Sequence, residues 1–280
     1  MDKPTFLWLN GRLWNAQEAS ISPFDHGLLV GDGVFETLVV REGRPVGVKP
    51  HYERLVRSCQ TIGLACITEA EFRQGIQAVL EANGLTDARV RVTLTSGDGP
   101  LGSDRGQGLG TVMAVATALK PWPPAEEVWI VPWVRNSRSA LAGVKSLSYG
   151  ENVRCLLHAK NLGSGEALLL NERDELCEGT GSNVFIVSEG RLMTPPLSSG
   201  CLAGTTRAWV LQACEVAGIE CLQCDIPAAW LEGCAEAFLT SSTRDVHPIS
   251  RLNGKPLTAP GPLTRRVQQA YAEFVERETA

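Results

Sequence analysis

Three short motifs follow one another between residues 145 and 207: KSLSYG at 145–150, CEGTGSN at 177–183 and GTTR at 204–207. Lys145 stands between an apolar segment and a predicted helix, and a partly buried amine of this kind can form a Schiff base with an aldehyde. Glu178 lies between two apolar segments, where a buried carboxylate needs a partner such as a protonated ring nitrogen. Gly204-Thr205-Thr206 directly precedes a predicted helix, whose first amides favour an anion such as phosphate.

Together these motifs resemble those of the class IV, or fold-type IV, pyridoxal-phosphate enzymes, which include branched-chain and D-amino-acid aminotransferases and aminodeoxychorismate lyase. The resemblance runs from about Leu9 to Gly254. It implies an α+β fold with two subdomains, like that of D-amino-acid aminotransferase, and pyridoxal 5'-phosphate (PLP) as the cofactor. It also implies that Lys145 forms the internal aldimine and afterwards moves the α-proton of the substrate. The expected partners are an amino acid, a 2-oxo acid and a second copy of the chain in a homodimer.

The resemblance further implies which residues contact the cofactor and the substrate. Arg54, which its helical segment alone would place at the surface, is expected at the phosphate. Tyr149 is expected at the phenolic oxygen of the cofactor, with a packing role as the alternative. The expected cofactor contacts are Arg54, Lys145, Tyr149, Glu178, Leu202, Gly204, Thr205, Thr206, Ser241 and Ser242. The expected substrate contacts are Phe35, Arg91 and Thr243.

Motifs near the expected substrate site leave two activities open. Phe35-Glu36-Thr37 and Lys145-Ser146-Leu147 look more like the lyase or D-amino-acid groups than the branched-chain group. The loop SGDGPLGSDRG at 96–106 lacks the Arg-x-His pair of D-amino-acid aminotransferases. The lyases have an arginine and an aromatic residue in this loop, and Leu101 and Ser103 stand at those positions here. The missing lyase arginine favours transamination, and the alternative is 4-amino-4-deoxychorismate lyase, which eliminates pyruvate to give 4-aminobenzoate.

The pattern of apolar residues alternates between helical and strand periods along the whole chain. Strands are predicted over 6–14, 88–96, 111–119 and 128–134, with a hairpin whose return strand is VGVKP at 46–50. Helices are predicted over 51–63, 69–83, about 151–161 and 206–218, the first two ending at glycine. The segment KPWPPA at 120–125 contains three prolines and predicts a linker between subdomains 1–119 and 126–280.

Composition excludes several other classes of protein. The 280 residues are 44% hydrophobic and carry a net charge of −5, without the basic stripe that nucleic-acid binding needs. No apolar run approaches the roughly 20 residues of a membrane span, and the first residues lack a signal-peptide pattern. The nine cysteines are scattered through apolar segments, which indicates reduced thiols in a cytoplasmic protein.

Two motifs suggest other chemistry but do not meet its requirements. Gly97 to Gly102 spells the dinucleotide pattern GxGxxG, yet the sequence continues as a loop and then a strand, without the helix that the pattern requires. Cys221 and Cys224 have zinc-ligand spacing but no second pair or nearby histidine, so no metal site is predicted. The four histidines show no ligand spacing and are interpreted as structural.

Overall fold

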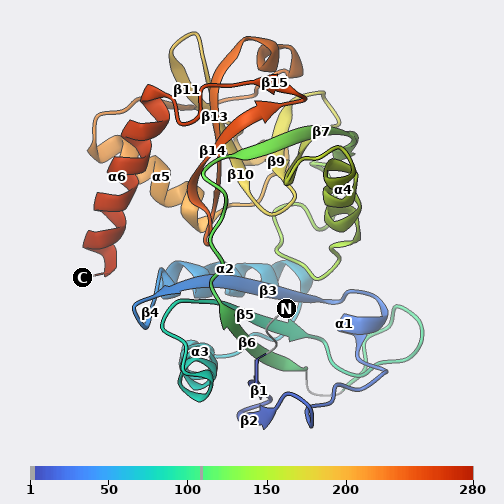
Figure 1. The fold of residues 1–280 in the computed structure, drawn as a ribbon. Coiled ribbons are helices and arrows are strands. Elements are labelled where there is room, and N and C mark those ends of the chain that lie inside the picture. The colour runs from blue at the N-terminus through green and yellow to red at the C-terminus, as the bar shows by residue number, and fades with distance from the viewer. Residues whose placement is uncertain (1–3, 108–109, 280) are drawn as a thin grey trace. The chain divides into compact units, whose positions relative to one another are not determined.

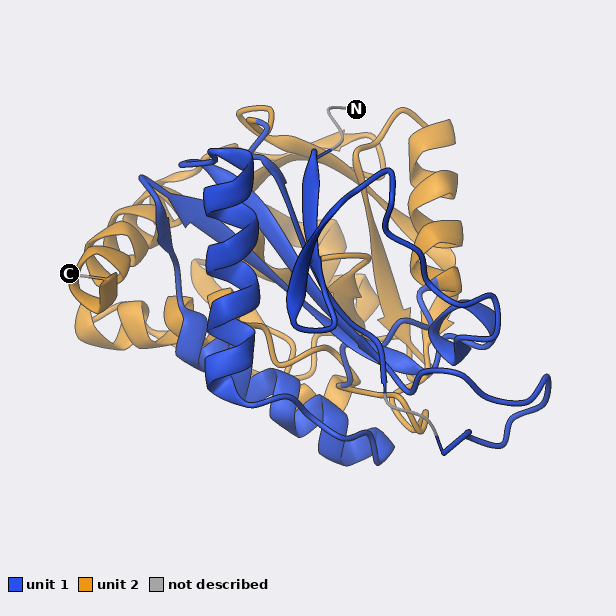
Figure 2. Ribbon diagram, turned by 90° about the horizontal axis from the view of Figure 1, so that it is seen from below, with its two compact units in different colours: residues 1–120, 144–149 blue, residues 121–143, 150–280 orange. Residues whose placement is uncertain are grey.

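The alternating helical and strand segments form two separate sheets. A computed structural model of the chain describes residues 4–107 and 110–279. It divides into unit 1, residues 1–120 and 144–149, and unit 2, residues 121–143 and 150–280 (Figures 1 and 2). The expected α+β class is confirmed, because each unit contains one sheet covered by helices. None of the helices in the described ranges is long and apolar enough to cross a membrane.

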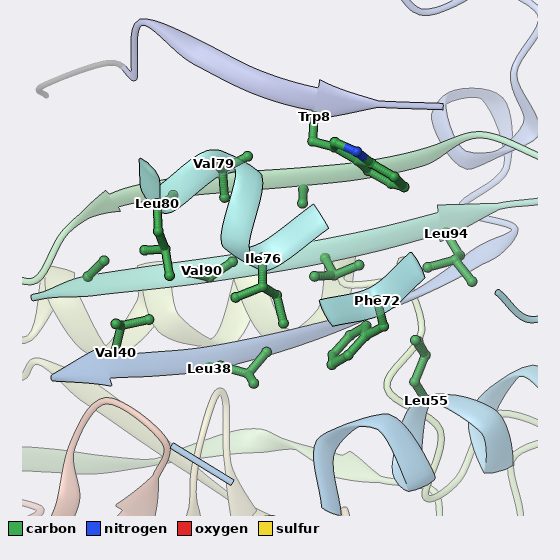
Figure 3. Close-up of a cluster of buried hydrophobic side chains, with 14 of the residues drawn as sticks. Trp8, Leu38, Val40, Leu55, Phe72, Ile76, Val79, Leu80, Val90 and Leu94 are labelled. Atoms are coloured by element: carbon green, nitrogen blue, oxygen red, sulfur yellow. The ribbon is translucent and has the colours of Figure 1, made fainter. Parts of the chain in front are cut away.

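Unit 1 contains an antiparallel sheet of six strands in the order β2-β1-β6-β5-β3-β4. Its elements are β1 (Phe6–Leu9), β2 (Arg12–Asn15), α1 (His26–Leu29), β3 (Gly33–Arg41), β4 (Arg44–Pro45), α2 (Val48–Ile62), α3 (Glu69–Asn83), β5 (Ala88–Thr95) and β6 (Val112–Ala118). Apolar side chains of α2 and α3, including Leu55, Phe72 and Ile76, pack on one face of this sheet (Figure 3). This face forms the core of unit 1.

Strand β3 separates two groups of side chains because successive residues of a strand point to opposite faces. Val34, Leu38 and Val40 belong to the core cluster with α2 and α3. Glu36 shares their alternation and is fully buried, whereas Phe35 has the opposite alternation. Glu36 therefore lies on the same face of β3 as the core residues, and Phe35 lies on the opposite face. Both faces carry residues of the candidate site.

The segment 144–149 belongs to unit 1 although it follows the first strand of unit 2 in the sequence. Its backbone pairs with the beginning of β3: the Phe35 amide donates to the Lys145 carbonyl at 3.0 Å, and the Leu147 amide donates to the Gly33 carbonyl at 2.9 Å. Val34 and Ser146 form the antiparallel bridge between these bonds. Lys145 is thus held by β3 through its backbone.

Unit 2 contains a mixed sheet in the order β12-β11-β10-β13-β14-β7-β8-β9, with β15 paired to β14. Helix α4 packs on β7 and β8, while α5 and α6 pack on each other and on β13. Its strands are β7 (Glu126–Arg135), β8 (Glu166–Asn171), β9 (Leu176–Gly179), β10 (Asn183–Ser188), β11 (Arg191–Thr194), β12 (Cys221–Gln223), β13 (Cys234–Ser241), β14 (Asp245–Leu252) and β15 (Lys255–Pro256). Its helices are α4 (Gly150–Asn161), α5 (Thr205–Val216), α6 (Pro262–Thr279) and the 3-10 turns η1 (Leu197–Ser199) and η2 (Ala228–Gly233).

Two predicted elements are wrong, and several are confirmed. The single strand expected at 6–14 is the antiparallel pair β1 and β2, because Asn10 and Gly11 take left-handed conformations with φ of 48° and 89° and turn the chain between them. The return strand expected at 46–50 instead spans Arg44–Pro45. It ends there because Gly47 takes a left-handed conformation with φ of 66° and α2 begins at Val48. Proline is tolerated in the first turn of a helix, so Pro50 does not prevent this early start. The predicted glycine ends of α2 and α3 are confirmed, since Gly63 and Gly84 both occupy left-handed C-cap positions.

Candidate active site

The aromatic ring of Phe35 is the centre of the first group of candidate residues, in unit 1. The guanidinium carbon of Arg91 lies 3.6 Å from the ring centroid, and the Lys145 Nζ lies 4.4 Å from it. Tyr149 meets the same ring edge-on, with the two centroids 5.2 Å apart. Arg91 also donates through Nε to the Thr93 hydroxyl at 3.2 Å. The Phe35 ring therefore lies next to an amine, a guanidinium and a phenol. All of these residues are candidates from the sequence analysis.

Arg54 belongs to a second group in unit 1, made of buried charges. Its Nε donates to Glu36 Oε1 at 2.8 Å and its Nη2 donates to Glu36 Oε2 at 2.6 Å. The His51 Nδ1 lies 2.7 Å from the same Oε2. Arg54 is only 5% exposed, so the surface position that its helical segment alone suggested is wrong.

Burial and charge act in opposite directions on the pKa of Glu36. Burial raises it, but the charge and hydrogen bonds of Arg54, helped by His51, outweigh burial and lower the pKa of Glu36 to about 2. Burial lowers the pKa of His51, although its contact with Glu36 opposes that shift. The carboxylate is thus ionised at neutral pH, and it fixes the plane of the Arg54 guanidinium through two bonds.

Glu178 is a buried carboxylate at the end of β9 in unit 2, with 8% of the residue exposed. Its Oε2 accepts a hydrogen bond from the Leu202 amide at 2.9 Å, and its Oε1 lies 3.2 Å from Arg135 Nε. The partner that a buried carboxylate needs is therefore partly supplied by Arg135, which the sequence did not indicate. An ionised carboxylate in this position can accept a hydrogen bond from a protonated ring nitrogen.

The beginning of α5 combines a close backbone approach with an uncapped helix terminus. Gly204 is the N-cap residue, and since glycine has no side chain it cannot cap the helix. A Cβ atom on Gly204 would clash with the Asn183 side-chain oxygen, so a larger residue would require Asn183 to move. Asn183 in turn donates to the Leu202 carbonyl at 2.8 Å, which joins this terminus to the Glu178 region. Thr205 and Thr206 open the 12-residue helix, whose dipole favours an anion.

The remaining candidates, Ser241, Ser242 and Thr243, lie at the β13–β14 turn of unit 2. Ser241 is opposite Asp245 in the strand ladder, and the Arg244 amide donates to the Ser241 carbonyl at 3.1 Å. The three hydroxyl residues thus occupy one tight turn, as their adjacency in sequence predicts.

Sequence analysis missed several polar residues that support these groups. They are Glu36 and His51 in unit 1 and Arg135, Asn183, Glu166 and Arg244 in unit 2. Glu36 carried a usable signal, because it is a lone acid on the otherwise apolar alternation of a strand. Within residues 4–107 and 110–279, no group of three or more His, Cys, Asp or Glu side chains could hold a metal ion.

A model of the family "Amino-transferase class IV" matches residues 33–252, which include every candidate residue described above. The chain belongs to this family. It is 31% identical over 277 residues to the D-alanine aminotransferase of Bacillus licheniformis, covering 97% of each chain. It is 30% identical over 256 residues to the aminodeoxychorismate lyase of Bacillus subtilis, covering 88% of this chain and 86% of the lyase.

The class IV fold is also that of a solved relative. The branched-chain aminotransferase of the archaeon Thermoproteus uzoniensis, solved with norvaline, superposes with a TM-score of 0.91 and is 28% identical in sequence. The match covers 98% of this chain and 95% of that chain. The expected two-subdomain, fold-type IV architecture is therefore confirmed, and this member of the class IV aminotransferase family is an enzyme.

Proposed function

We propose that the chain binds PLP and transfers the amino group between an amino acid and a 2-oxo acid. The observation that carries this proposal is the placement of Lys145 and Arg91 at one aromatic ring, 4.4 and 3.6 Å from its centroid. An α-amino acid has its carboxylate on the carbon whose proton must be moved. Arg91 would hold that carboxylate, and Lys145 would take up and return the α-proton, while Phe35 would line the substrate site beside them.

Each unit, taken separately, contains polar groups of the kinds that PLP requires. Bound PLP supplies an electron sink that makes the α-proton of an attached amino acid acidic. Glu178 would hold the proton at the ring nitrogen, and Tyr149 would hydrogen-bond the phenolic oxygen. The phosphate would be held by Arg54, by the amides and hydroxyls of Thr205 and Thr206, and by Gly204, Ser241 and Ser242. Leu202 is expected to contact the cofactor as well. Thr243 would contribute to the substrate site.

The similarity to known enzymes supports the same reaction without fixing the substrate. One relative is a D-alanine aminotransferase. A solved branched-chain amino acid aminotransferase, 25% identical to this chain with a TM-score of 0.89, is complexed with N-(5'-phosphopyridoxyl)-L-glutamate. A D-amino acid and an L-amino acid are thus both represented among proteins of this fold. The substrate side chain and its handedness are best determined by direct measurement.

The first experiment traps the cofactor on the protein. Borohydride reduction of the PLP-loaded protein, followed by peptide mass spectrometry, is expected to find the cofactor on the peptide that contains Lys145. Mixing the loaded protein with L- and D-amino acids, without any oxo acid, is then expected to bleach the visible band of the lysine-linked cofactor. The amino acid that bleaches it fastest identifies the substrate class. A protein that carries no reducible cofactor on Lys145 would contradict the proposal.

Aminodeoxychorismate lyase activity is the second candidate. It is supported by the motifs Phe35-Glu36-Thr37 and Lys145-Ser146-Leu147 and by the 30% identity to a lyase of Bacillus subtilis. Both activities need Lys145 and Glu178 in the same roles. A visible band that survives every amino acid, together with pyruvate release from 4-amino-4-deoxychorismate, would favour the lyase.

Replacing Glu178 with glutamine tests the expected role at the ring nitrogen. The variant is expected to bind PLP but to lower the rate of amino-group transfer by about 10²–10⁴-fold, because a neutral amide does not keep the nitrogen protonated. The rate is measured by stopped-flow absorbance of the loaded protein. Glu172, a 32% exposed side chain of the same unit, provides the matched Glu→Gln control. A Glu178→Gln variant with wild-type rates would remove this role.

We also propose that the chain acts as a homodimer in the cytoplasm. The nine cysteines are all free thiols in the structure, as a reducing compartment requires. Light scattering of the PLP-loaded protein measures the assembly directly.

A further inference from the structure

Building on the function proposed above, we propose that Glu166 and Arg244 are positioning residues that join two turns of unit 2. One turn, residues 180–182, follows Glu178, the expected partner of the ring nitrogen. The other, residues 241–244, contains hydroxyl groups expected at the phosphate. A buried ionic connection between the turns would fix the distance between the two ends of the cofactor.

Glu166 holds the first turn through both of its carboxylate oxygens. It is the first residue of β8 and is 3% exposed. Its Oε1 accepts hydrogen bonds from the Thr180 amide, at 3.2 Å, and from the Thr180 hydroxyl. Its Oε2 accepts from the Ser182 hydroxyl at 3.3 Å. One side chain therefore sets the shape of the turn that leads from Glu178 into β10.

Arg244 connects the second turn to the same carboxylate. It is the last residue before β14, and its Nη2 lies 3.8 Å from Glu166 Oε2. Its Nη1 donates to Glu126 Oε2 at 2.9 Å. The guanidinium also lies over the Trp122 ring, with its carbon 3.8 Å from the ring centroid. Three contacts thus hold a side chain that begins beside the expected phosphate residues.

The burial of these charges makes the connection sensitive to the loss of any member. Two carboxylates, Glu126 and Glu166, share one guanidinium, and all three side chains are less than 10% exposed. A buried charge that loses its partner is strongly unfavourable, so each group constrains the others. The local backbone fits this arrangement, because a Cβ atom on Gly165 would clash with the Glu126 carboxylate.

The neighbouring His247 does not add a second positive charge beside Arg244. Burial, followed by the positive charge of Arg244, lowers the pKa of His247 to about 4. His247 is therefore neutral at physiological pH, and Arg244 is the cation that pairs with Glu126 and Glu166 there.

The connection predicts that a substitution at one turn changes the binding of the opposite end of the cofactor. Apo-protein is titrated with PLP, with pyridoxal, which lacks the phosphate, and with a deaza analogue, which has carbon in place of the ring nitrogen. Wild type is expected to prefer PLP over both. Glu166→Gln is expected to reduce the preference for PLP over pyridoxal by about tenfold or more, although the turn to which Glu166 is hydrogen-bonded is the one at the ring nitrogen. Arg244→Met is expected to reduce the preference for PLP over the deaza analogue by a similar factor.

An exposed ion pair between two strands of the same sheet provides the matched control. Arg251 of β14 lies 3.5 Å from Glu127 of β7, and both side chains are 50% exposed. Glu127→Gln and Arg251→Met are expected to leave both preferences at the wild-type value. If Arg244→Met does not fold, Arg244→Lys replaces it, because lysine keeps the charge but not the planar, two-branched contact.

The outcomes separate this inference from the function on which it rests. Variants with lower melting temperatures but wild-type preferences would overturn the positioning role, since a merely structural pair affects folding alone. A wild-type protein that shows neither preference would instead overturn the proposed cofactor site.

Discussion

Replacing Lys145 with alanine is expected to lower the rate of amino-group transfer by at least about 10⁴-fold, because one amine provides both the covalent attachment and the base. The variant is also expected to leave no cofactor on the protein after borohydride reduction. Its fold should be unchanged, since the contacts that hold the segment to β3 are made by the backbone of Lys145 and Leu147. Stopped-flow absorbance, peptide mass spectrometry and thermal melting measure the three quantities separately.

Lys160 provides the control for this variant. It is an exposed lysine on α4 of unit 2. Lys160→Ala is expected to retain wild-type turnover and wild-type labelling at Lys145. Normal turnover of the Lys145→Ala variant, with a normal melting temperature, would contradict the assignment of Lys145 as the reactive amine.

Replacing Glu36 with glutamine is expected to destabilise unit 1 by about 3–5 kcal/mol, because Arg54 would remain as a buried charge without its carboxylate. Glu36 is fully buried and Arg54 is 5% exposed, so solvent screens their interaction little. Hydrogen–deuterium exchange of peptides from β3 and α2 measures the loss of stability within unit 1 itself. The same variant is expected to weaken PLP binding, because the carboxylate would no longer hold in place the Arg54 guanidinium that is proposed to bind the phosphate.

An exposed pair of equal length in unit 1 separates burial from charge. Arg73 and Glu69 of α3 approach within 2.6 Å, the same distance as Arg54 and Glu36, but their side chains are 52% and 41% exposed. Glu69→Gln is expected to cost no more than about 0.5 kcal/mol, as is usual for exposed helical pairs. Equal losses for Glu36→Gln and Glu69→Gln would show that the buried pair has no special role.

The pH dependence of stability has a defined sign at this site. The pKa of Glu36 is lowered in the folded state, from 4.5 to about 2, so its contribution is complete above pH 4.5 and is lost as the pH falls toward 2. The buried His51, whose pKa is lowered from 6.5, contributes in the same direction from a higher pH. Wild type and Glu36→Gln should therefore differ most in stability at neutral pH and become more alike toward pH 2.

The sequence predicted the parts of the fold and of the candidate site that depend on local patterns. The glycine ends of α2 and α3 followed from apolar periodicity and from the left-handed conformation that glycine adopts at a helix end. The position of Gly204 before α5 followed in the same way. The roles expected of Lys145 and Glu178 come from the order of their motifs along the chain, and they stay predictions.

Pairings between distant segments could not be predicted in this way. Glu166 and Arg244 are 78 positions apart, and no local period specifies that both contact the same cluster. Arg54 shows the same limit: its helical position taken alone suggested solvent, but a carboxylate from β3 holds its guanidinium in the interior. Such contacts depend on strand register, which is set by the packing of a whole sheet face.

The path of the chain through its two units has a consequence for synthesis on the ribosome. Unit 1 takes residues 144–149 from a stretch flanked on both sides by unit 2. Until Tyr149 has left the exit tunnel, the beginning of β3 lacks the backbone partners that Lys145 and Leu147 provide. A nascent chain that has emerged only as far as residue 120 therefore has an unfinished strand edge at Gly33–Phe35, where it can pair with other chains. Lys145, the proposed reactive amine, and the last backbone pairing of β3 are thus added to unit 1 in the same step.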